Sequence, residues 1–432
     1  MIAKGQVNKM GKLKSKILNF SIKHAKQIMK YVPTPIVKFV ENIVVNKNSY
    51  EFERVQKFDK NLKTGINFVG YLKAQSGLGQ GSRLFCKSIR NSKYDFAAID
   101  TKYGENKSYN ETEFDDVLTT EFPYDINILH VQPHTNFEIA LSQISIENLK
   151  GRYNIGYWLY ELEDIPEKWH NSFKYVNEIW TPSEFVKNAF EKVSPVPVYC
   201  LPYGIQTKKN DALTRKDFGI PEDKFVYLCL YDPKSSVERK NPQAVIKAFK
   251  KAFKGNDENV FLVIKMIKGT QENIDELENE LKEISNYKII NDLLPQDDLY
   301  SLISLCDVYV SLHRSEGFGL VMAEAMSLGT VCIATNYSAN IDFMNKENSL
   351  LVDYKMVPVG IKNHYLYGEK DLWADADVEQ ASKYMMKLYE DKELYNKLKE
   401  NAQKYIAEEF SIQASAKKIE KRIDEIIKEN DL

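Results

Sequence analysis

The sequence has 432 residues with a hydrophobic fraction of 43% and a charged fraction of 28%, and its formal net charge at pH 7 is −2. This length and composition predict a folded protein of about two or three domains. The near-zero charge excludes a polyanion-binding surface over the whole molecule, and no stretch approaches the ~18 apolar residues of a transmembrane helix.

The first 50 residues differ from the rest because they hold ten lysines and one acidic residue, Glu41, for a local charge of +9. Residues 12–31 have the periodicity of an amphipathic helix that ends before Pro33. Either its apolar side packs on the protein with the lysines in water, or it lies on an anionic membrane surface, or the segment is a disordered leader. We treat residues 1–50 as a basic amphipathic extension. One side of the helix carries Lys12, Lys16, Lys23, Lys26 and Lys30.

The location of the protein is predicted from its cysteines and its N-terminus. The apolar runs near the N-terminus are interrupted and lack the cleavage pattern of a signal peptide. The cysteines form no C-x-x-C pair, and most lie in apolar runs, which favours buried, reduced thiols. We therefore expect a cytoplasmic protein, peripheral on the inner face of the cell membrane if the extension binds lipid. The cysteines are Cys86, Cys200, Cys229, Cys306 and Cys332.

From about residue 65, buried apolar runs alternate with helical periods. This alternation is typical of a parallel sheet with crossover helices. Thr181-Pro182-Ser183 ends one strand and starts a helix, with Ser183 as its cap. We assign residues 51–206 to a first Rossmann-like domain. Its predicted strands are 66–72, 95–100, 126–131, 153–160, 178–183 and 197–205.

Residues 206–221 are polar and break the pattern, so we place the domain linker there. The alternation restarts and predicts a second doubly wound domain over residues 222–404, facing the first across a central cleft. The C-terminal helix, 405–432, is expected to pack back on the first domain. The second domain should contain strands 224–231, 259–266, 287–292, 307–312 and 330–335, and helices 241–254, 271–285, 296–305 and 319–328.

The most informative segment is SLHRSEGFGLVMAEAMSLGT, residues 311–330. A strand ends near Leu312, and a loop with two glycines leads into a helix that Gly329 terminates. The glycines let a ligand approach the backbone, and the helix N-terminus offers amide groups to a phosphate. Glu324 lies inside that helix among small apolar residues, where a carboxylate needs hydrogen bonds, and ribose hydroxyls would supply them. The alternative is a solvated glutamate on an ordinary helix that follows a glycine turn.

Glu316 and Glu324, eight residues apart in SEGFGLVMAEAM, resemble the E-x7-E signature of the retaining glycosyltransferases of family 4, which have the GT-B fold. The likeness extends over nearly all of residues 65–425. The segments that look like a bacterial branch of this family are GYLKAQSGLGQGSR (70–83), GYWLYELEDIPEKW (156–169), EIWTPSEFVKNAF (178–190), RKNPQAVIKAF (239–249) and ATNYSANIDFM (334–344).

The resemblance implies that the first domain faces the acceptor and the second binds the donor. It implies that Glu324 binds the nucleotide ribose and that Glu316 lies beside the donor sugar. The backbone of the next four residues would hold the sugar hydroxyls and the phosphate; these are Gly317, Phe318, Gly319 and Leu320.

Lys240 matches the diphosphate-binding lysine of the family, whose ammonium would stabilise the leaving nucleoside diphosphate. The family's usual arginine several residues upstream is not evident in this sequence. Arg239 and Lys234 are the candidates for the second cation, and the sequence leaves that choice open.

A first glycine-rich loop, SGLGQGS at residues 76–82, follows a strand and opens a helix. A dinucleotide-binding motif counted from Gly77 would place its third glycine at Ser82, so the spacing fails. The resemblance assigns the loop, with Gly77 and Gly79, to the side of the cleft that faces the donor diphosphate; a plain structural turn is the alternative.

Many family members place a histidine after the strand that aligns with IGYWLY, and here Tyr160 and Glu161 follow that strand. We predict that Glu161 contacts the acceptor or the donor sugar; the alternative is a surface glutamate at a strand end. His130 and His134 belong to the end of the preceding strand, and His134 is a weaker candidate for a loop contact.

Asp375 and Asp377 form a D-x-D, a pattern that holds a divalent cation in transferases of a different fold. Because the pair precedes a predicted helix, we interpret both as helix caps. No His/Cys cluster has zinc spacing, and the N-terminal lysines lack the context of a nucleic-acid-binding motif. We expect no metal, no nucleic acid and no cofactor beyond the nucleoside-diphosphate sugar as co-substrate.

The resemblance implies retaining, metal-independent transfer of a sugar to an acceptor hydroxyl, in bacterial surface glycan or polysaccharide synthesis. No side chain stands out as an enzymic nucleophile, which favours front-face attack assisted by the leaving phosphate. The acceptor would be a glycan or a lipid-linked glycan. A sugar-nucleotide epimerase of the same fold, and a silent member that binds a membrane or a partner, are the alternatives.

Overall fold

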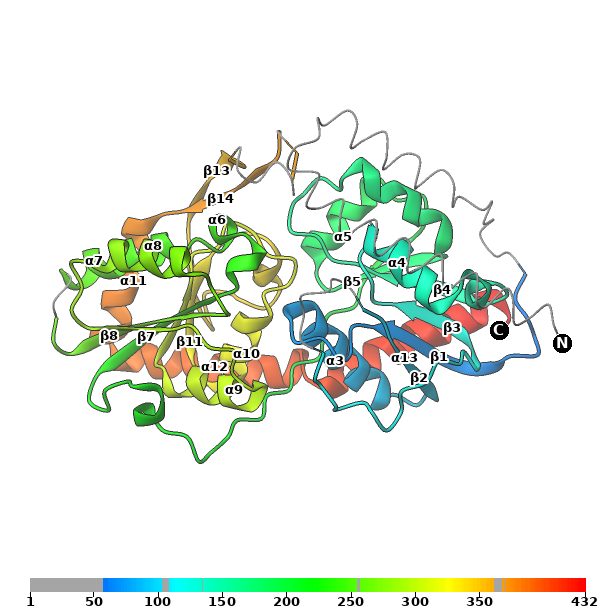
Figure 1. Cartoon of the computed structure of the whole chain (residues 1–432), viewed down its shortest axis with the longest axis horizontal. Helices are drawn as coiled ribbons and strands as arrows, with labels where there is room; N and C mark the ends of the chain where they lie inside the picture. Colours follow the sequence, from blue (N-terminus) through cyan, green and yellow to red (C-terminus); the bar gives the residue numbers. More distant parts are fainter. Residues whose placement is uncertain (1–56, 103–108, 134, 255–256, 361–366, 369) are drawn as a thin grey trace.

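The computed structural model describes residues 57–102, 109–133, 135–254, 257–360, 367–368 and 370–432. The predicted N-terminal helix and His134 lie outside these ranges. Within them the chain forms two α/β units side by side, and Figure 1 shows the first (blue to green) and the second (green to orange).

The described part of the first unit contains a six-stranded sheet in the order β2-β1-β3-β4-β5-β6, and every neighbouring pair is parallel. The six strands that the alternation predicted are confirmed, although several are shorter than expected. They are β1 (Lys63–Gly70), β2 (Phe96–Asp100), β3 (Tyr124–Leu129), β4 (Tyr153–Tyr157), β5 (Glu178–Thr181) and β6 (Val198–Cys200).

Helices cover both faces of this sheet, so its strands are buried almost throughout and consist of apolar runs. Large aromatic side chains fill the core, among them Trp180, Tyr157 and Phe85, whose rings are in contact. Ser183 caps α5 by accepting a hydrogen bond from the Val186 amide, as the sequence predicted. The helices are α3 (Gly77–Arg90), α4 (Thr135–Ile144) and α5 (Glu184–Glu191).

The second unit repeats the plan with the parallel order β12-β11-β10-β7-β8-β9 among the described residues. The five predicted strands and four predicted helices are all present. The strands are β7 (Phe225–Tyr231), β8 (Val260–Met266), β9 (Tyr287–Ile290), β10 (Val308–Ser311), β11 (Val331–Thr335) and β12 (Leu350–Val352), and the helices are α6 (Val237–Lys240), α7 (Pro242–Phe253), α8 (Gln271–Leu281), α9 (Gln296–Leu305), α10 (Leu320–Leu328) and α11 (Val378–Glu390).

An antiparallel hairpin is among the elements of this unit that were not predicted, together with β12 and α6. Strands β13 (Tyr354–Pro358) and β14 (Leu372–Ala376) pair antiparallel outside the main sheet. Trp373 of β14 is buried and lies against the guanidinium of Arg314, 5.4 Å from the ring centroid. The hairpin therefore packs beside the loop that follows β10.

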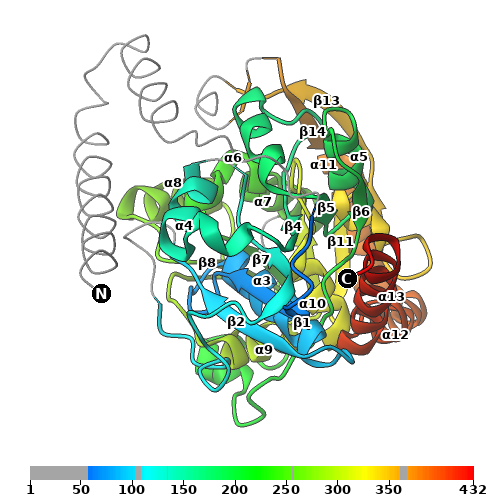
Figure 2. The same cartoon turned by 90° about the vertical axis from the view of Figure 1, so that its right-hand side faces the viewer.

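The C-terminal segment joins the two units. The predicted single helix over 405–432 is wrong, because α12 (Lys392–Glu409) ends at Phe410 and α13 (Ile412–Asn430) begins after Ser411, which caps it. At this break the Ile205 amide donates to the Phe410 carbonyl at 2.6 Å. Figures 1 and 2 show α12 along the second unit and α13 along the first.

Candidate functional site

The loop between β10 and α10 lies at the carboxyl edge of the second sheet, where parallel α/β sheets bind ligands. Gly319 precedes α10 with φ at +91°, a left-handed conformation that strains other residues. Gly317 lies so close to the first unit that a Cβ there would be 3.0 Å from the Tyr160 carbonyl oxygen. The two glycines are therefore required by the backbone's turn and by its close approach to the other unit.

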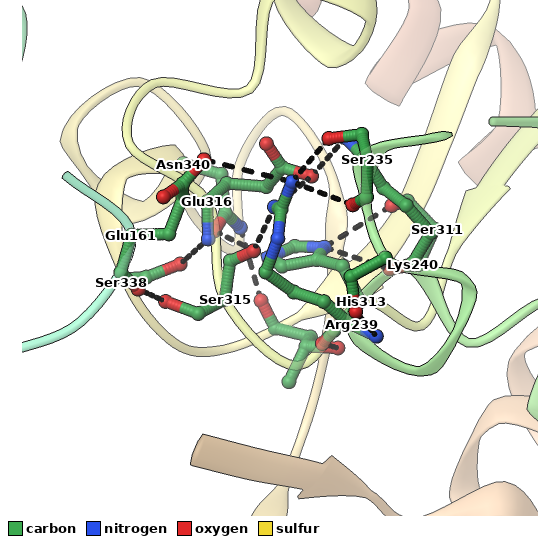
Figure 3. Close-up of polar contacts among 12 residues, drawn as sticks. Glu161, Ser235, Arg239, Lys240, Ser311, His313, Ser315, Glu316, Ser338 and Asn340 are labelled. Atoms are coloured by element: carbon green, nitrogen blue, oxygen red, sulfur yellow. Dashed lines mark hydrogen bonds and ion pairs between the residues drawn. The ribbon is translucent and has the colours of Figure 1, made fainter. Parts of the chain in front are cut away.

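Glu316 is the charged centre of this loop. Its Oε1 accepts a hydrogen bond from Lys240 Nζ and lies 3.2 Å from Arg239 Nη1, as Figure 3 shows. Burial by itself raises the pKa of Glu316, but the charges of Lys240 and Arg239 outweigh burial and hold the pKa at about 2. Glu316 is therefore ionised throughout the physiological range, with both cations beside it.

Arg239, one of the two candidates for the second cation, lies beside Glu316. Its side chain is buried, and its guanidinium donates to the Ser315 carbonyl at 2.7 Å and to Ser235 Oγ at 2.8 Å. These bonds hold the guanidinium in place beside Glu316. Lys234 forms no ion pair with any residue that the structure describes, and its amide instead completes a turn with Asp232.

Glu161 comes to the same place from the first unit. Its carboxylate is 3.7 Å from Arg239 Nη2, and its carbonyl oxygen accepts a hydrogen bond from Ser315 Oγ. Ser183 Oγ also reaches across and donates to the Gly317 carbonyl at 2.9 Å. The segments that follow β4 and β5 therefore contact the β10–α10 loop directly. Glu161 adds a second carboxylate beside Arg239, next to Glu316.

Glu324 lies one turn into α10 and is 2% exposed. Its Oε1 accepts hydrogen bonds from the Tyr300 hydroxyl at 2.8 Å and from Gln80 Nε2 at 3.3 Å. Burial raises the pKa of Glu324 to about 7, and the two hydrogen bonds oppose this shift.

Gln80 and Tyr300 are the residues that sequence reasoning missed. Gln80 stands inside the SGLGQGS loop, where only the glycines were considered, and Tyr300 has no motif around it on α9. A buried carboxylate requires donors, but one-dimensional spacing does not show which distant helices supply them.

Gly77 and Gly79, the two candidates in the first loop, have different surroundings. A Cβ at Gly79 would be 2.0 Å from the Ala74 carbonyl oxygen, so the loop's own packing requires this glycine. A Cβ at Gly77 would meet nothing within 4 Å, and Gly77 is exposed. Of these two candidates, internal packing explains Gly79 and does not explain Gly77.

The remaining candidates are packing residues. Phe318 is buried with its ring against Tyr203 and Phe343, so only its backbone is available to a ligand, and Leu320 is half-buried at the start of α10. His130 is a core histidine that contacts Ser82 Oγ at 3.0 Å and the Tyr203 hydroxyl at 2.8 Å. Burial lowers the pKa of His130 to about 3, so it stays neutral.

The prediction for the D-x-D is half wrong. Asp377 caps α11 by accepting from the amides of Glu379 and Gln380, as predicted. Asp375 lies on β14 and accepts two bonds from Arg314, at 2.8 and 3.1 Å, so it is no cap. The prediction failed because the strand extends to Ala376.

Among the described residues no group of three or more His, Cys, Asp or Glu is arranged to hold a metal, and no helix has the length and apolarity to span a membrane.

The chain is similar to known proteins in part of its sequence and in its fold. Residues 211–405 match the family model "Glycosyl transferases group 1". HepE of Anabaena, solved with UDP and glucose, superposes with a TM-score of 0.62 at 14% identity over 84% of this chain and 100% of its own. Sucrose-phosphate synthase of Thermosynechococcus elongatus superposes with a TM-score of 0.61 at 12% identity, over 85% of this chain and 100% of its own. A glycosyltransferase of Rickettsia africae superposes with a TM-score of 0.61 at 15% identity, over 85% of this chain and 99% of its own.

This is the GT-B fold. The likeness at 12 to 15% identity shows the fold, and the family match places the β10–α10 loop inside the segment shared with group 1 glycosyltransferases. No curated protein matches the sequence.

Proposed function

We propose that the protein is a retaining glycosyltransferase that moves a sugar from a nucleoside-diphosphate sugar to an acceptor hydroxyl. The observation that carries the proposal is the pairing of Lys240 and Arg239 with Glu316 at the carboxyl edge of the second sheet, with Glu324 eight residues further on. HepE was solved with UDP-glucose and TarM of S. aureus with UDP, and both share the fold, so a UDP-sugar is the donor we favour.

In this proposal Lys240 and Arg239 bind the donor diphosphate. As the bond between the anomeric carbon and the β-phosphate oxygen breaks, negative charge develops on that oxygen and the two cations stabilise it. Two fixed positive charges supply the compensation that a divalent ion provides elsewhere, so transfer needs no metal and no cofactor.

The acceptor hydroxyl attacks the anomeric carbon on the face that the diphosphate leaves, which retains the configuration. Its proton passes to the departing phosphate oxygen. Glu316 binds a hydroxyl of the donor sugar, and the amides of residues 317–320 bind the sugar and phosphate oxygens at the start of α10. Glu161, from the opposite unit, borders the reacting centre on the acceptor side.

The test is turnover and donor binding. Incubation with a panel of UDP-, GDP- and ADP-sugars should release one nucleoside diphosphate, while an epimerase would yield an altered sugar nucleotide. In calorimetry Glu324→Ala should lose roughly 1.5–3 kcal/mol of nucleoside-diphosphate binding, the range for hydrogen bonds to a charged group. A folded Glu324→Ala protein with unchanged affinity would contradict the ribose assignment.

For the acceptor we propose a glycan or lipid-linked glycan of the bacterial surface, reached from the cytoplasmic face of the membrane through residues 1–50. The +9 charge of this extension supports the proposal, since each lysine near an anionic surface adds about 1 kcal/mol that salt screens. The full chain should sediment with anionic vesicles at low salt, and a chain starting at Asn48 should not. If both stay in the supernatant, the membrane proposal is wrong.

A further inference from the structure

Gln80 is the one residue of the first unit that hydrogen-bonds Glu324 within the described part of the chain. It lies in the first turn of α3, and it is buried. Glu324 belongs to α10 of the second unit, so the contact crosses between the two sheets. The glycine at position 79 allows this turn to pack against the Ala74 carbonyl oxygen, which brings the Gln80 side chain to the boundary.

The orientation of the Gln80 amide is determined by Arg83. The Arg83 guanidinium is anchored to the carbonyls of Leu72 and Ala74 at 3.1 and 2.9 Å, and its Nη2 donates to Gln80 Oε1 at 3.0 Å. Because a guanidinium can only donate, the amide oxygen must face Arg83. The amide nitrogen therefore faces the second unit, where an acceptor is required.

Two acceptors meet that nitrogen. Gln80 Nε2 donates to the Tyr300 hydroxyl at 2.8 Å and to Glu324 Oε1 at 3.3 Å, and the Tyr300 hydroxyl in turn donates to Glu324 Oε1 at 2.8 Å. The directions of all four bonds agree, from Arg83 through Gln80 and Tyr300 to the carboxylate. Both hydrogen bonds that described side chains donate to the Glu324 carboxylate reach Oε1, so none of these side chains donates to Oε2.

We propose that Gln80 and Tyr300 are positioning residues that orient Glu324 and favour its carboxylate form for the ribose of the donor, so that the ribose site is complete only when the two units meet. The inference rests on the proposed function, since it assigns the ribose to Glu324. It adds that the first unit takes part in nucleotide recognition through a side chain as well as through its loop backbone.

Electrostatics agree with this role. The groups that face Glu324 are Tyr300 on α9 and Gln80, Arg83 and Lys87 on α3. Burial raises the pKa of Glu324, whereas each of these groups lowers it. A carboxylate accepts hydroxyl hydrogen bonds in its ionised form. Removing a donor from Oε1 should therefore raise the pKa further and move the pH at which donor binding becomes strong to a higher value.

The experiment measures UDP affinity by calorimetry between pH 6 and pH 9 for the full chain and for Gln80→Met and Tyr300→Phe. Each variant should bind UDP roughly tenfold more weakly at pH 7, the loss of one hydrogen bond to a charged acceptor. The deficit should shrink toward pH 9, because a higher pH restores the carboxylate. UDP's own phosphate ionisation is the same for every variant and cancels in the ratio.

The matched controls are Gln143→Met and Tyr395→Phe, which remove an amide and a hydroxyl that bond elsewhere, to Thr101 and to the Asp307 carbonyl. Both should keep the wild-type affinity and pH profile. A loss in Gln80→Met and Tyr300→Phe that is equal at every pH would indicate a packing defect and overturn the positioning role, as would a wild-type profile in both.

The same measurements distinguish a failure of the proposed function from a failure of the positioning role. If the wild-type protein binds no nucleoside diphosphate, or if Glu324→Ala binds UDP as the wild type does, the proposed function fails. If the wild type binds UDP, Glu324→Ala binds it more weakly, and both Gln80→Met and Tyr300→Phe are unchanged, only the positioning role fails.

Discussion

Two buried glutamates stand where distant parts of the chain meet, and their surroundings differ. Glu178 on β5 faces α13, and both of its oxygens are used: Oε1 accepts from Trp180 and Arg422 at 2.6 and 3.2 Å, and Oε2 accepts from Tyr153 and Arg422 at 2.9 and 2.7 Å. Glu324 between α10 and α3 has two neutral donors, both on one oxygen.

The comparison distinguishes a structural carboxylate from a candidate functional one. Both oxygens of Glu178 already accept hydrogen bonds from Arg422 and from one further donor each, so the carboxylate joins β5 to α13 and has a structural role. A buried carboxylate with one unoccupied oxygen and a pKa raised to about 7 by burial is costly to the fold unless a ligand uses it.

The largest effect is expected at the structural contact. Arg422→Met leaves Glu178 buried without its cation and should cost about 3–5 kcal/mol of unfolding free energy, measured by urea denaturation. Lys60→Met, which breaks the exposed pair with Asp431 on the same C-terminal segment, should change the unfolding free energy far less, because solvent screens that pair. Equal losses in the two variants would remove the distinction between the contacts.

The next largest effect is expected on turnover when Lys240, which we propose to bind the donor diphosphate, is replaced. Lys240→Met should lower kcat by roughly 10²–10³-fold, the cost of removing one preorganised charge from a developing anion. Stability should change little, because the variant still leaves Arg239 to pair with Glu316. Lys251→Met, which breaks the exposed pair with Glu379, is the control and should retain full kcat. Unchanged turnover in Lys240→Met would exclude the proposed role.

A smaller effect concerns the contribution of Glu324 to the stability of the fold at different pH values. The folded-state pKa of Glu324 is raised from 4.5 to about 7, so the folded state binds the proton more tightly than the unfolded chain. The resulting stability is present below pH 4.5 and is lost as the pH rises to about 7. Glu324→Gln should therefore gain stability relative to the wild type over that window, by about 1–3 kcal/mol at pH 8. A pH-independent difference in thermal unfolding would contradict the shift.

The smallest effect is expected from metal removal. Because Lys240 and Arg239 compensate the diphosphate charge in the proposed mechanism, turnover in excess EDTA should equal turnover without it. Abolished activity that Mn²⁺ or Mg²⁺ restores would show that the two cations are not sufficient.

The periodicity of the sequence determined most of the fold. Strands buried on both faces, such as β7 and β8, are almost entirely apolar, and helices between them must be amphipathic, so both patterns are local and readable. The E-x7-E spacing brought Glu316 and Glu324 to one loop and helix for the same reason. The β13–β14 hairpin escaped prediction because its residues are half exposed and carry no clear alternation.

Only the tertiary structure decided which partners these residues have. Arg239 lies beside Glu316 because α6 directs its guanidinium at Ser315 and Glu316, and Asp375 is a partner of Arg314 because β14 extends past it. Gln80 lies 244 residues before Glu324, and no local pattern encodes a hydrogen bond across that separation. Sequence spacing specifies what shares a strand or helix, whereas contacts between two sheets depend on how the whole chain packs.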